Sequence, residues 1–254
     1  MRLITLNIWG GKIFEPLMEF LRVRAKDTDI FCFQEIFHTP TKKEINNGAR
    51  VNIYTEIKNI LPDFQDFYAP AQDGFDHHGA VDFNLSFGLA IFVKNSMRID
   101  KHGDVFVFRD RNARKDDNTS IGRNLEFITF KQNKKKFAVF NFHGLWNGMG
   151  KTDTEDRLEQ SRKVKEFMKK FNDLEKILCG DFNLLPNTES LAILSEDMKN
   201  LVKDFDITST RSKLYTKPEK FADYILVSPD VSVKKFTVMQ DEVSDHLPLL
   251  LEFD

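Results

Sequence analysis

The sequence predicts a strand-rich α/β sandwich, and three observations support this fold class. Short apolar runs of strand length recur from one end of the chain to the other. Helical patterns lie between them, and many strands with helices between and outside them are typical of layered α/β folds. No internal repeat, low-complexity tract or Pro/Ser-rich linker divides the chain, so we predict one domain over residues 1–254.

The predicted strands are apolar runs of two kinds. Some are apolar on both faces, as expected for strands buried between two layers. Others alternate, as in Glu126–Phe130, and so have one more polar face. In chain order the runs are Leu3–Ile8, Ile30–Phe33, Leu89–Val93, Leu125–Phe130, Phe137–Phe142, Ile177–Cys179, Tyr224–Val227 and Leu247–Phe253.

Two helices are predicted from their start signals and apolar stripes. Pro16 suits a first helical position, and the stripe of Leu17, Phe20 and Leu21 follows it. Thr152 and Glu155 have capping-box spacing ahead of a second helix that runs to about Phe171. In this helix we expect an apolar face and a solvated face, with Leu158, Val164, Phe167, Met168 and Phe171 on the first and Arg157, Lys163 and Lys170 on the second.

Polar stretches mark the predicted loops. Those at roughly 71–86, 109–121 and 206–220 are long for a compact domain, and long loops often shape a binding site. The lysine-rich run 131–136 is interpreted as a solvated turn between two strands. His77 and His78 lie in the first loop and are predicted to be exposed loop residues rather than ligands, with a role facing the substrate as the alternative.

Charge and composition limit the classes of function. With 37 basic and 39 acidic residues the net charge is −2, whereas duplex-DNA binders carry a basic excess, so strong duplex binding is not expected. Cys32 and Cys179 lie in apolar runs and are predicted to be core residues rather than a disulfide framework. No apolar run has the length of a membrane span and the first residues lack an export-signal pattern, so we expect a cytoplasmic protein, and a monomer.

The chemically informative residues stand where the apolar runs end. Strand ends in layered α/β folds bring side chains from distant parts of the sequence to one rim. Hard oxygen ligands and two imidazoles on such a rim suit Mg²⁺, with Mn²⁺ as a substitute, and do not suit structural zinc. Each residue alone has an ordinary structural explanation, and their joint occurrence favours function. The set is Asn7, Glu35, His143, Asp181, Asn183, Asp245 and His246.

This ordered set resembles the endonuclease/exonuclease/phosphatase superfamily, also called DNase I-like. No single motif is specific, but together they span nearly the whole chain in order. The resemblance implies an α/β (α+β) four-layer sandwich, in which two central, mostly antiparallel β-sheets are flanked by helices. The motifs are Thr5-Leu6-Asn7, Gln34-Glu35, Asn141-Phe142-His143, Gly180-Asp181-Phe182-Asn183, Ala222-Asp223-Tyr224-Ile225-Leu226 and Ser244-Asp245-His246-Leu247-Pro248.

The resemblance also implies a metal site and a set of catalytic residues. Glu35 is the expected principal Mg²⁺ ligand with Asn7 beside it, and Asp245 either ligates metal or orients its neighbour. Among the expected catalytic residues, Asp181 orients or deprotonates the attacking water, and Asn183 contacts the phosphate. His143 is expected to act as a general acid or phosphate ligand. His246 is expected to stabilise developing charge, while Asp223 holds its other ring nitrogen. Arg123, at the start of a strand, is a weaker candidate for a substrate-phosphate contact.

Three hypotheses for function follow. The first is a magnesium-dependent phosphodiesterase or phosphatase, in which an activated water attacks a small-molecule or lipid-headgroup phosphoester in line. The second is a nuclease acting on single-stranded or structured nucleic acid. The third, a catalytically inactive binding module, is disfavoured because each assigned position holds a competent residue type. Trp9 stands where nucleases of the exonuclease III type often carry an acidic residue, which argues against abasic-site repair.

Overall fold

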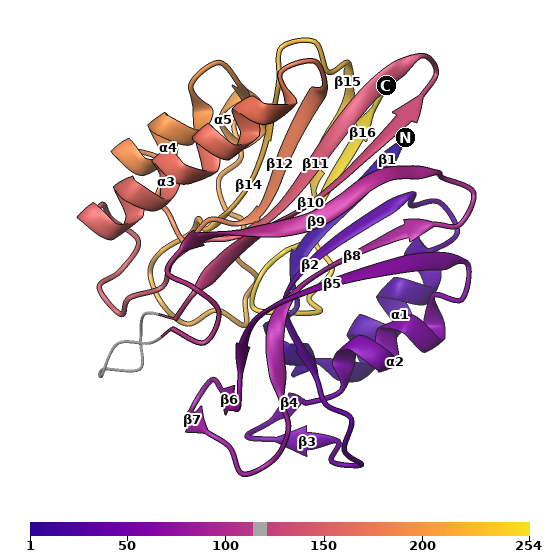
Figure 1. The fold of residues 1–254 in the computed structure, drawn as a ribbon, viewed down its shortest axis with the longest axis vertical. Coiled ribbons are helices and arrows are strands. Elements are labelled where there is room, and N and C mark those ends of the chain that lie inside the picture. The colour runs from indigo at the N-terminus through magenta and orange to yellow at the C-terminus, as the bar shows by residue number, and fades with distance from the viewer. Residues whose placement is uncertain (114–120) are drawn as a thin grey trace.

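Two large β-sheets stack with helices on their outer sides in the computed structural model (Figure 1). The structure describes residues 1–113 and 121–254. Sheet one has the strand order β15 (Val233–Val238), β16 (Leu249–Phe253), β1 (Arg2–Asn7), β2 (Ile30–His38), β8 (Ser86–Lys94) and β5 (Phe64–Asp73). Sheet two has the order β13 (Lys199–Asn200), β14 (Asp223–Val227), β12 (Glu175–Asp181), β11 (Lys135–His143), β10 (Arg123–Gln132) and β9 (Ile99–Phe108).

The helices form the two outer layers. Helices α1 (Phe14–Arg24) and α2 (Ile53–Ile60) lie on sheet one, and α3 (Glu155–Met168), α4 (Glu189–Ser195) and α5 (Leu201–Asp204) lie on sheet two (Figure 1). Two small hairpins, β3–β4 and β6–β7, project from one end; their strands are Ile45–Asn46, Ala49–Arg50, Phe75–Asp76 and Gly79–Ala80. The predicted four-layer sandwich is confirmed. No helix in the described ranges combines the length and apolarity needed to cross a bilayer.

Alternating side chains explain why the central strands are buried on both faces. In β2, Ile30 and Cys32 belong to the core shared with sheet two, whereas Phe31 and Phe33 pack in the core beneath α1 and α2. A strand whose successive side chains point to opposite faces needs apolar residues at every position when both faces are covered. The continuous apolar run at residues 30–33 is therefore the signature of a central layer.

Each sheet contains one parallel pair at its centre, and the other neighbouring pairs are antiparallel among the described strands. The parallel pairs are β1–β2 and β11–β12. Their register places Asn7 opposite Gln34 and His143 opposite Asp181. Because parallel strands end at the same edge, the topology brings polar residues from four strands to one end of the sandwich.

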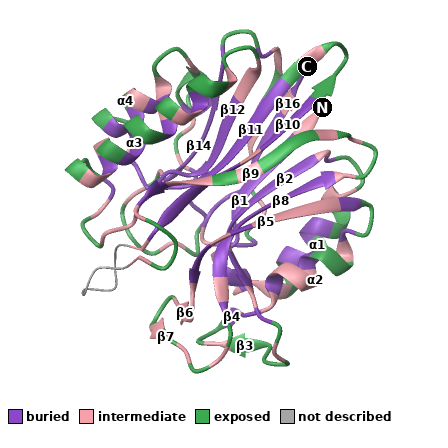
Figure 2. Ribbon diagram, in the orientation of Figure 1, coloured by how far each residue is buried: buried purple, intermediate pink, exposed green. Residues whose placement is uncertain are grey.

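The strands that the sequence pattern did not reveal lie at sheet edges. In the two large sheets they are β5, β9, β13 and β15, and β9 carries a largely exposed face (Figure 2). An edge strand lies partly in water and often carries charged residues, so its apolar pattern is weak. The predicted loop 71–86 is partly strand, because residues 71–73 belong to β5 and residues 75–76 and 79–80 form the β6–β7 hairpin. Residues 114–120 of the predicted loop 109–121 lie outside the described part of the chain.

Two details of the predicted helices are corrected. Helix α1 begins at Phe14, so Pro16 lies within its first turn rather than at the first position. Thr154, not Thr152, caps α3 by accepting a hydrogen bond from the backbone N–H of Arg157. Arg157 itself is buried rather than solvated, because its guanidinium donates to the carbonyls of Gly150, Thr152 and Leu145 and so fixes the loop before the helix.

A buried polar contact links the two sheets. Asn141 Oδ1 accepts a hydrogen bond from Gln34 Nε2 at 2.7 Å, and Asn141 Nδ2 donates to Glu126 Oε2 at 3.0 Å. Burial raises the pKa of Glu126 well above its usual value, against the hydrogen bond from Asn141. Glu126 is therefore protonated in the folded protein at a pH where an unfolded chain would have lost that proton.

The Glu126→Gln substitution is expected to remove a pH-dependent loss of stability. The folded-state pKa is raised, so the stability contributed by Glu126 is present below the ordinary glutamate pKa and is lost as pH rises toward the folded value. The free energy of unfolding, measured in urea from about pH 5 to about pH 8, should therefore become increasingly larger for the variant than for the unaltered protein, by up to about 1.4 kcal/mol per pH unit. Parallel stability curves for the two proteins would contradict a protonated Glu126.

Candidate active site

The polar ends of the central strands open into a pocket of about 440 Å³. Most of the residues singled out from the sequence line it: Glu35, Arg123, His143, Asp181, Asn183, Asp245 and His246. Asn7 and Asp223 lie behind this lining. Asn7 Nδ2 donates to Glu35 Oε1 and to Asp181 Oδ2, both at 3.0 Å. Asp223 is bonded to His246, so all nine residues form one connected group.

Backbone geometry places several of these side chains. Strand β2 does not end at Glu35 as its apolar run suggested, but continues to His38 through a register shift between Phe33 and Ile36. A bulge of this kind re-aims a side chain within a continuing strand. Glu35 has φ 60°, and Trp9 and Asn183 have φ 52° and 54°. Left-handed conformations at residues other than glycine are uncommon and strained, and strain of this kind clusters at functional sites.

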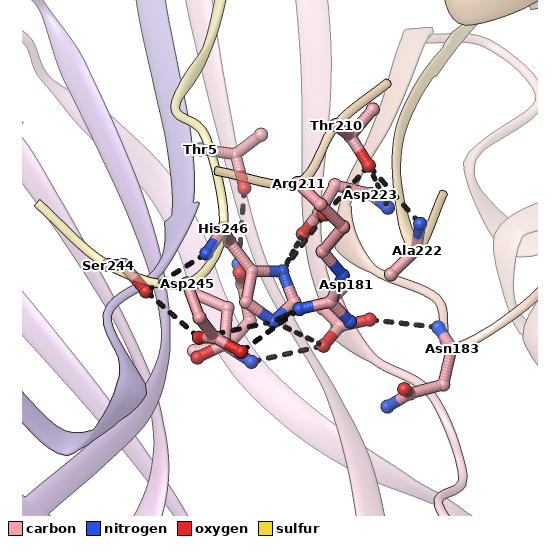
Figure 3. A network of polar contacts seen from close by, with 12 residues as sticks. Thr5, Asp181, Asn183, Thr210, Arg211, Ala222, Asp223, Ser244, Asp245 and His246 are labelled. Atoms are coloured by element: carbon pink, nitrogen blue, oxygen red, sulfur yellow. Dashed lines mark hydrogen bonds and ion pairs between the residues drawn. The ribbon is translucent and has the colours of Figure 1, made fainter. Parts of the chain in front are cut away.

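His246 lies between two carboxylates, as Figure 3 shows. Its Nδ1 is 2.7 Å from Asp223 Oδ1, and its Nε2 is 3.5 Å from Asp181 Oδ2. Asp223 also accepts a hydrogen bond from the hydroxyl of Thr210 at 3.0 Å. Burial and the charge of Arg211 lower the pKa of His246, but Asp223, Asp181 and Asp245 raise it by more, so the net shift favours the imidazolium.

Asp181 is an ionised carboxylate within a cationic environment. Burial would raise its pKa, but the charges of His246, Lys151, His143 and Arg211 outweigh burial and hold the pKa below its usual value. Its oxygens accept from Asn7 Nδ2 and from the backbone N–H of Asn183 at 2.9 Å. The strand leading to it passes close to β11, because Gly180, with φ 135°, has no Cβ that would collide with the carbonyl of Phe142.

Both oxygens of Glu35 have partners within the protein. Oε1 accepts from Asn7, and Oε2 lies 3.1 Å from His77 Nε2. Burial would raise the pKa of Glu35, but His77, His143 and Asn7 outweigh it and hold the pKa well below its usual value. His77 and His78 are exposed as residues, in agreement with the prediction, yet the His77 ring reaches the site and has only 26% of its side chain exposed.

His143 is paired with Arg123. Arg123 Nη1 is 3.2 Å from His143 Nδ1, so Nδ1 accepts and the ring carries its proton on Nε2. Nε2 lies 3.7 Å from Asp181 Oδ2 and 4.0 Å from Glu35 Oε1. Burial and the charge of Arg123 lower the pKa of His143 to about 3, which makes this imidazole neutral near pH 7.

Two buried cations at the pocket, Lys151 and Arg211, were not predicted from the sequence. Lys151 Nζ donates to Asn183 Oδ1 at 2.9 Å. Arg211 Nη1 donates to Asp245 Oδ2 at 3.3 Å and contacts His246 Nε2. The signals were present but weak: Lys151 follows a glycine-rich turn, and Arg211 lies in the long polar loop predicted at 206–220.

Comparisons with known proteins bear on the family and the fold of the chain. A sequence model of the Endonuclease/Exonuclease/phosphatase family matches residues 4–246. Similar solved structures include a mannosyl-6-phosphatase of Bacteroides thetaiotaomicron, with 20% identity, TM-score 0.72 and coverage of 100% of this chain and 99% of that one. A family protein of Leptotrichia buccalis has 19% identity, TM-score 0.75 and the same coverages. The human nocturnin catalytic domain, solved with a sulfate anion, has 17% identity, TM-score 0.68 and coverages of 100% and 94%. No curated protein matches the sequence.

Proposed function

Because the chain belongs to the endonuclease/exonuclease/phosphatase family, we propose that it is a Mg²⁺-dependent hydrolase that cleaves a phosphoester by in-line attack of an activated water. One observation carries the proposal. Three carboxylates and two imidazoles from both sheets converge on a single pocket: Glu35, Asp181, Asp245, His143 and His246. Phosphoryl transfer needs a positioned water and neutralised charge on the phosphate oxygens, and this set offers groups for both.

The donor chemistry fits Mg²⁺ or Mn²⁺ at Glu35. Glu35 is held ionised at the pocket, Asp245 faces the same space, and Asn7 adds an amide. Asn7 Oδ1 accepts from the backbone N–H of Trp9, so joining the ligand set would require this oxygen to turn toward the ion. Bound there, the metal would supply Lewis acidity that neutralises charge on the phosphate.

A second group of potential ligands is less suitable for the ion. Asp181, Asp223 and His246 have ligand atoms within 4.8 Å of one another. In this trio, however, His246 Nδ1 and Asp223 already bond each other at 2.7 Å, and Thr210 donates to the same carboxylate. The other ring nitrogen, Nε2, contacts the guanidinium of Arg211, and a guanidinium at that position disfavours a second cation, so we assign Asp223 to holding the His246 ring.

The remaining side chains have separate roles in the proposed reaction. Asp181, which its depressed pKa keeps ionised, orients the attacking water, and we assign it as the group that accepts the proton. His246, cationic and held by Asp223, donates from Nε2 to a non-bridging phosphate oxygen, which requires Arg211 Nη1 to turn from Nε2 toward the same phosphate. His143 is neutral, so we assign it a hydrogen bond from Nε2–H to the phosphate rather than general-acid catalysis. Asn183 and Arg123 contact the phosphate at the pocket wall.

A hydrolysis panel with Mg²⁺, with Mn²⁺ and with excess EDTA tests the reaction class. The substrates are a generic phosphomonoester, a generic phosphodiester, inositol phosphates, sphingomyelin, and single- and double-stranded nucleic acids. We expect turnover of at least one ester with either metal, and loss of that turnover in EDTA. Turnover that persists in EDTA would remove the metal from the mechanism, and preference for single-stranded nucleic acid would favour the nuclease hypothesis.

A further inference from the structure

Three cations are buried at the wall of the pocket. Arg123, Lys151 and Arg211 are 6%, 3% and 9% exposed, and they come from separate segments of the chain. Each contacts a different residue of the proposed machinery: Arg123 contacts His143, Lys151 contacts Asn183, and Arg211 contacts Asp245 and His246. The positive charge at the pocket therefore comes from three separate parts of its lining.

Two of these cations have no carboxylate partner among the described residues. Within residues 1–113 and 121–254, neither Arg123 nor Lys151 forms an ion pair at 4.0 Å or less, whereas Arg211 has Asp245. Burial without a full partner is costly for a cation, and it lowers the pKa of Arg123 to about 10 and lowers that of Lys151. A bound anion would give Arg123 and Lys151 the negatively charged partner that the described residues do not provide, so these two cations are suited to binding an anionic ligand.

The loop around Lys151 is built to hold this cation in place. The buried guanidinium of Arg157 donates to the carbonyls of Gly150 and Leu145, on either side of the turn that leads to Lys151. The carbonyl of Lys151 also accepts a hydrogen bond from the backbone N–H of Leu185 at 3.0 Å. A long side chain whose backbone and ammonium are both fixed loses little further entropy on binding an anion.

The charge of the pocket matches a dianion better than a monoanion. Five lysines and arginines line it against four aspartates and glutamates, in a chain whose acidic residues outnumber the basic ones, 39 to 37. A divalent ion at Glu35 would add to this positive charge. A phosphomonoester carries about two negative charges and three non-bridging oxygens near neutral pH, because its second pKa is about 6. A diester carries only one charge and has one fewer such oxygen.

We propose that the pocket selects phosphomonoesters over phosphodiesters, with Arg123, Lys151 and Arg211 binding the terminal phosphate dianion. This inference rests on the proposed hydrolase function and names the substrate class of the same site. A volume of about 440 Å³ suits a small-molecule monoester. Lys151 is the discriminating residue, because its ammonium is the buried cation that contacts neither imidazole nor carboxylate of the site.

The kinetic test compares 4-nitrophenyl phosphate with methyl 4-nitrophenyl phosphate, two esters with the same leaving group, in the presence of Mg²⁺. We expect a higher kcat/KM for the monoester. The Lys151→Met variant should reduce the ratio of the two kcat/KM values at least about tenfold, since a charge-assisted hydrogen bond to the dianion is lost. Lys163→Met, an exposed lysine on α3, is the matched control and should leave the ratio unchanged. A faster diester reaction, or an equal loss for both esters, would overturn the proposal.

A binding test separates this proposal from the hydrolase function. Both tryptophans of the chain, Trp9 and Trp146, line the pocket, so their fluorescence reports on ligand binding. Methylphosphonate and dimethylphosphinate are analogues of a monoester dianion and a diester monoanion that have no P–O–C bond and so cannot be hydrolysed. At mildly alkaline pH with Mg²⁺ present, the dianion should bind at least about tenfold more tightly, and Lys151→Met should remove that preference. Equal affinities would refute the selection, whereas a dianion preference without hydrolysis of any ester would refute only the proposed reaction.

Discussion

The Glu35→Gln substitution is expected to lower kcat for the preferred phosphoester by about 10³-fold or more. It removes the ionised carboxylate that faces the pocket and replaces it with an amide of nearly the same shape, so a divalent cation loses its principal charged ligand. The change also leaves His77 without its carboxylate partner at 3.1 Å. Because the glutamine oxygen can keep the hydrogen bond from Asn7, the thermal midpoint should change little.

Calorimetric titration with Mg²⁺ and Mn²⁺ provides a second readout for Glu35→Gln. Affinity for both ions should fall together with kcat, and raising the metal concentration should restore part of the activity. Glu166→Gln, at an exposed glutamate on α3, is the control for the loss of one negative charge. If Glu35→Gln binds metal as tightly as the unaltered protein, the ion is held elsewhere and the trio of Asp181, Asp223 and His246 becomes the site to test.

The Asp181→Asn substitution is expected to lower kcat by about 10²- to 10⁴-fold with a smaller effect on KM, the range typical of losing a general base. Asp181 is 2% exposed and has His143 and His246 on either side, at 3.7 Å and 3.5 Å from the same oxygen. The amide can keep the backbone hydrogen bond from Asn183 but cannot accept a proton from water. Turnover by this variant is therefore limited to what charge stabilisation and positioning provide.

Folding must be measured alongside activity for Asp181→Asn, because its carboxylate also neutralises buried positive charge. We expect a loss of thermal stability much smaller than the loss of kcat, and no loss for the exposed control Asp230→Asn. Addition of inorganic phosphate should recover part of the stability if the vacated charge is replaced by a bound anion. A variant that folds normally and keeps more than about a tenth of kcat would exclude Asp181 as the base.

The layered architecture was predictable because the central strands carry a local signal. Residues such as those of the run 30–33 are buried on both faces, and this burial appears in the sequence as an unbroken apolar run. The edge strands β5, β9, β13 and β15 lacked this signal because one side of each is free of a neighbouring strand. Whether such a segment pairs with a sheet depends on its neighbours and not on its own pattern.

Part of the candidate site could likewise be predicted from the sequence, and part could not. By itself, the sequence determined which polar residues stand at the ends of the apolar runs. These residues converge because the parallel pairs β1–β2 and β11–β12 end at the same end of the sandwich. The contacts of His77, Lys151 and Arg211 with the site were decided only by tertiary structure, since these residues lie in polar segments where basic side chains are normally solvated. Arg157 shows the physical reason: three backbone carbonyls brought to its guanidinium by the fold make burial favourable, and no local pattern records them.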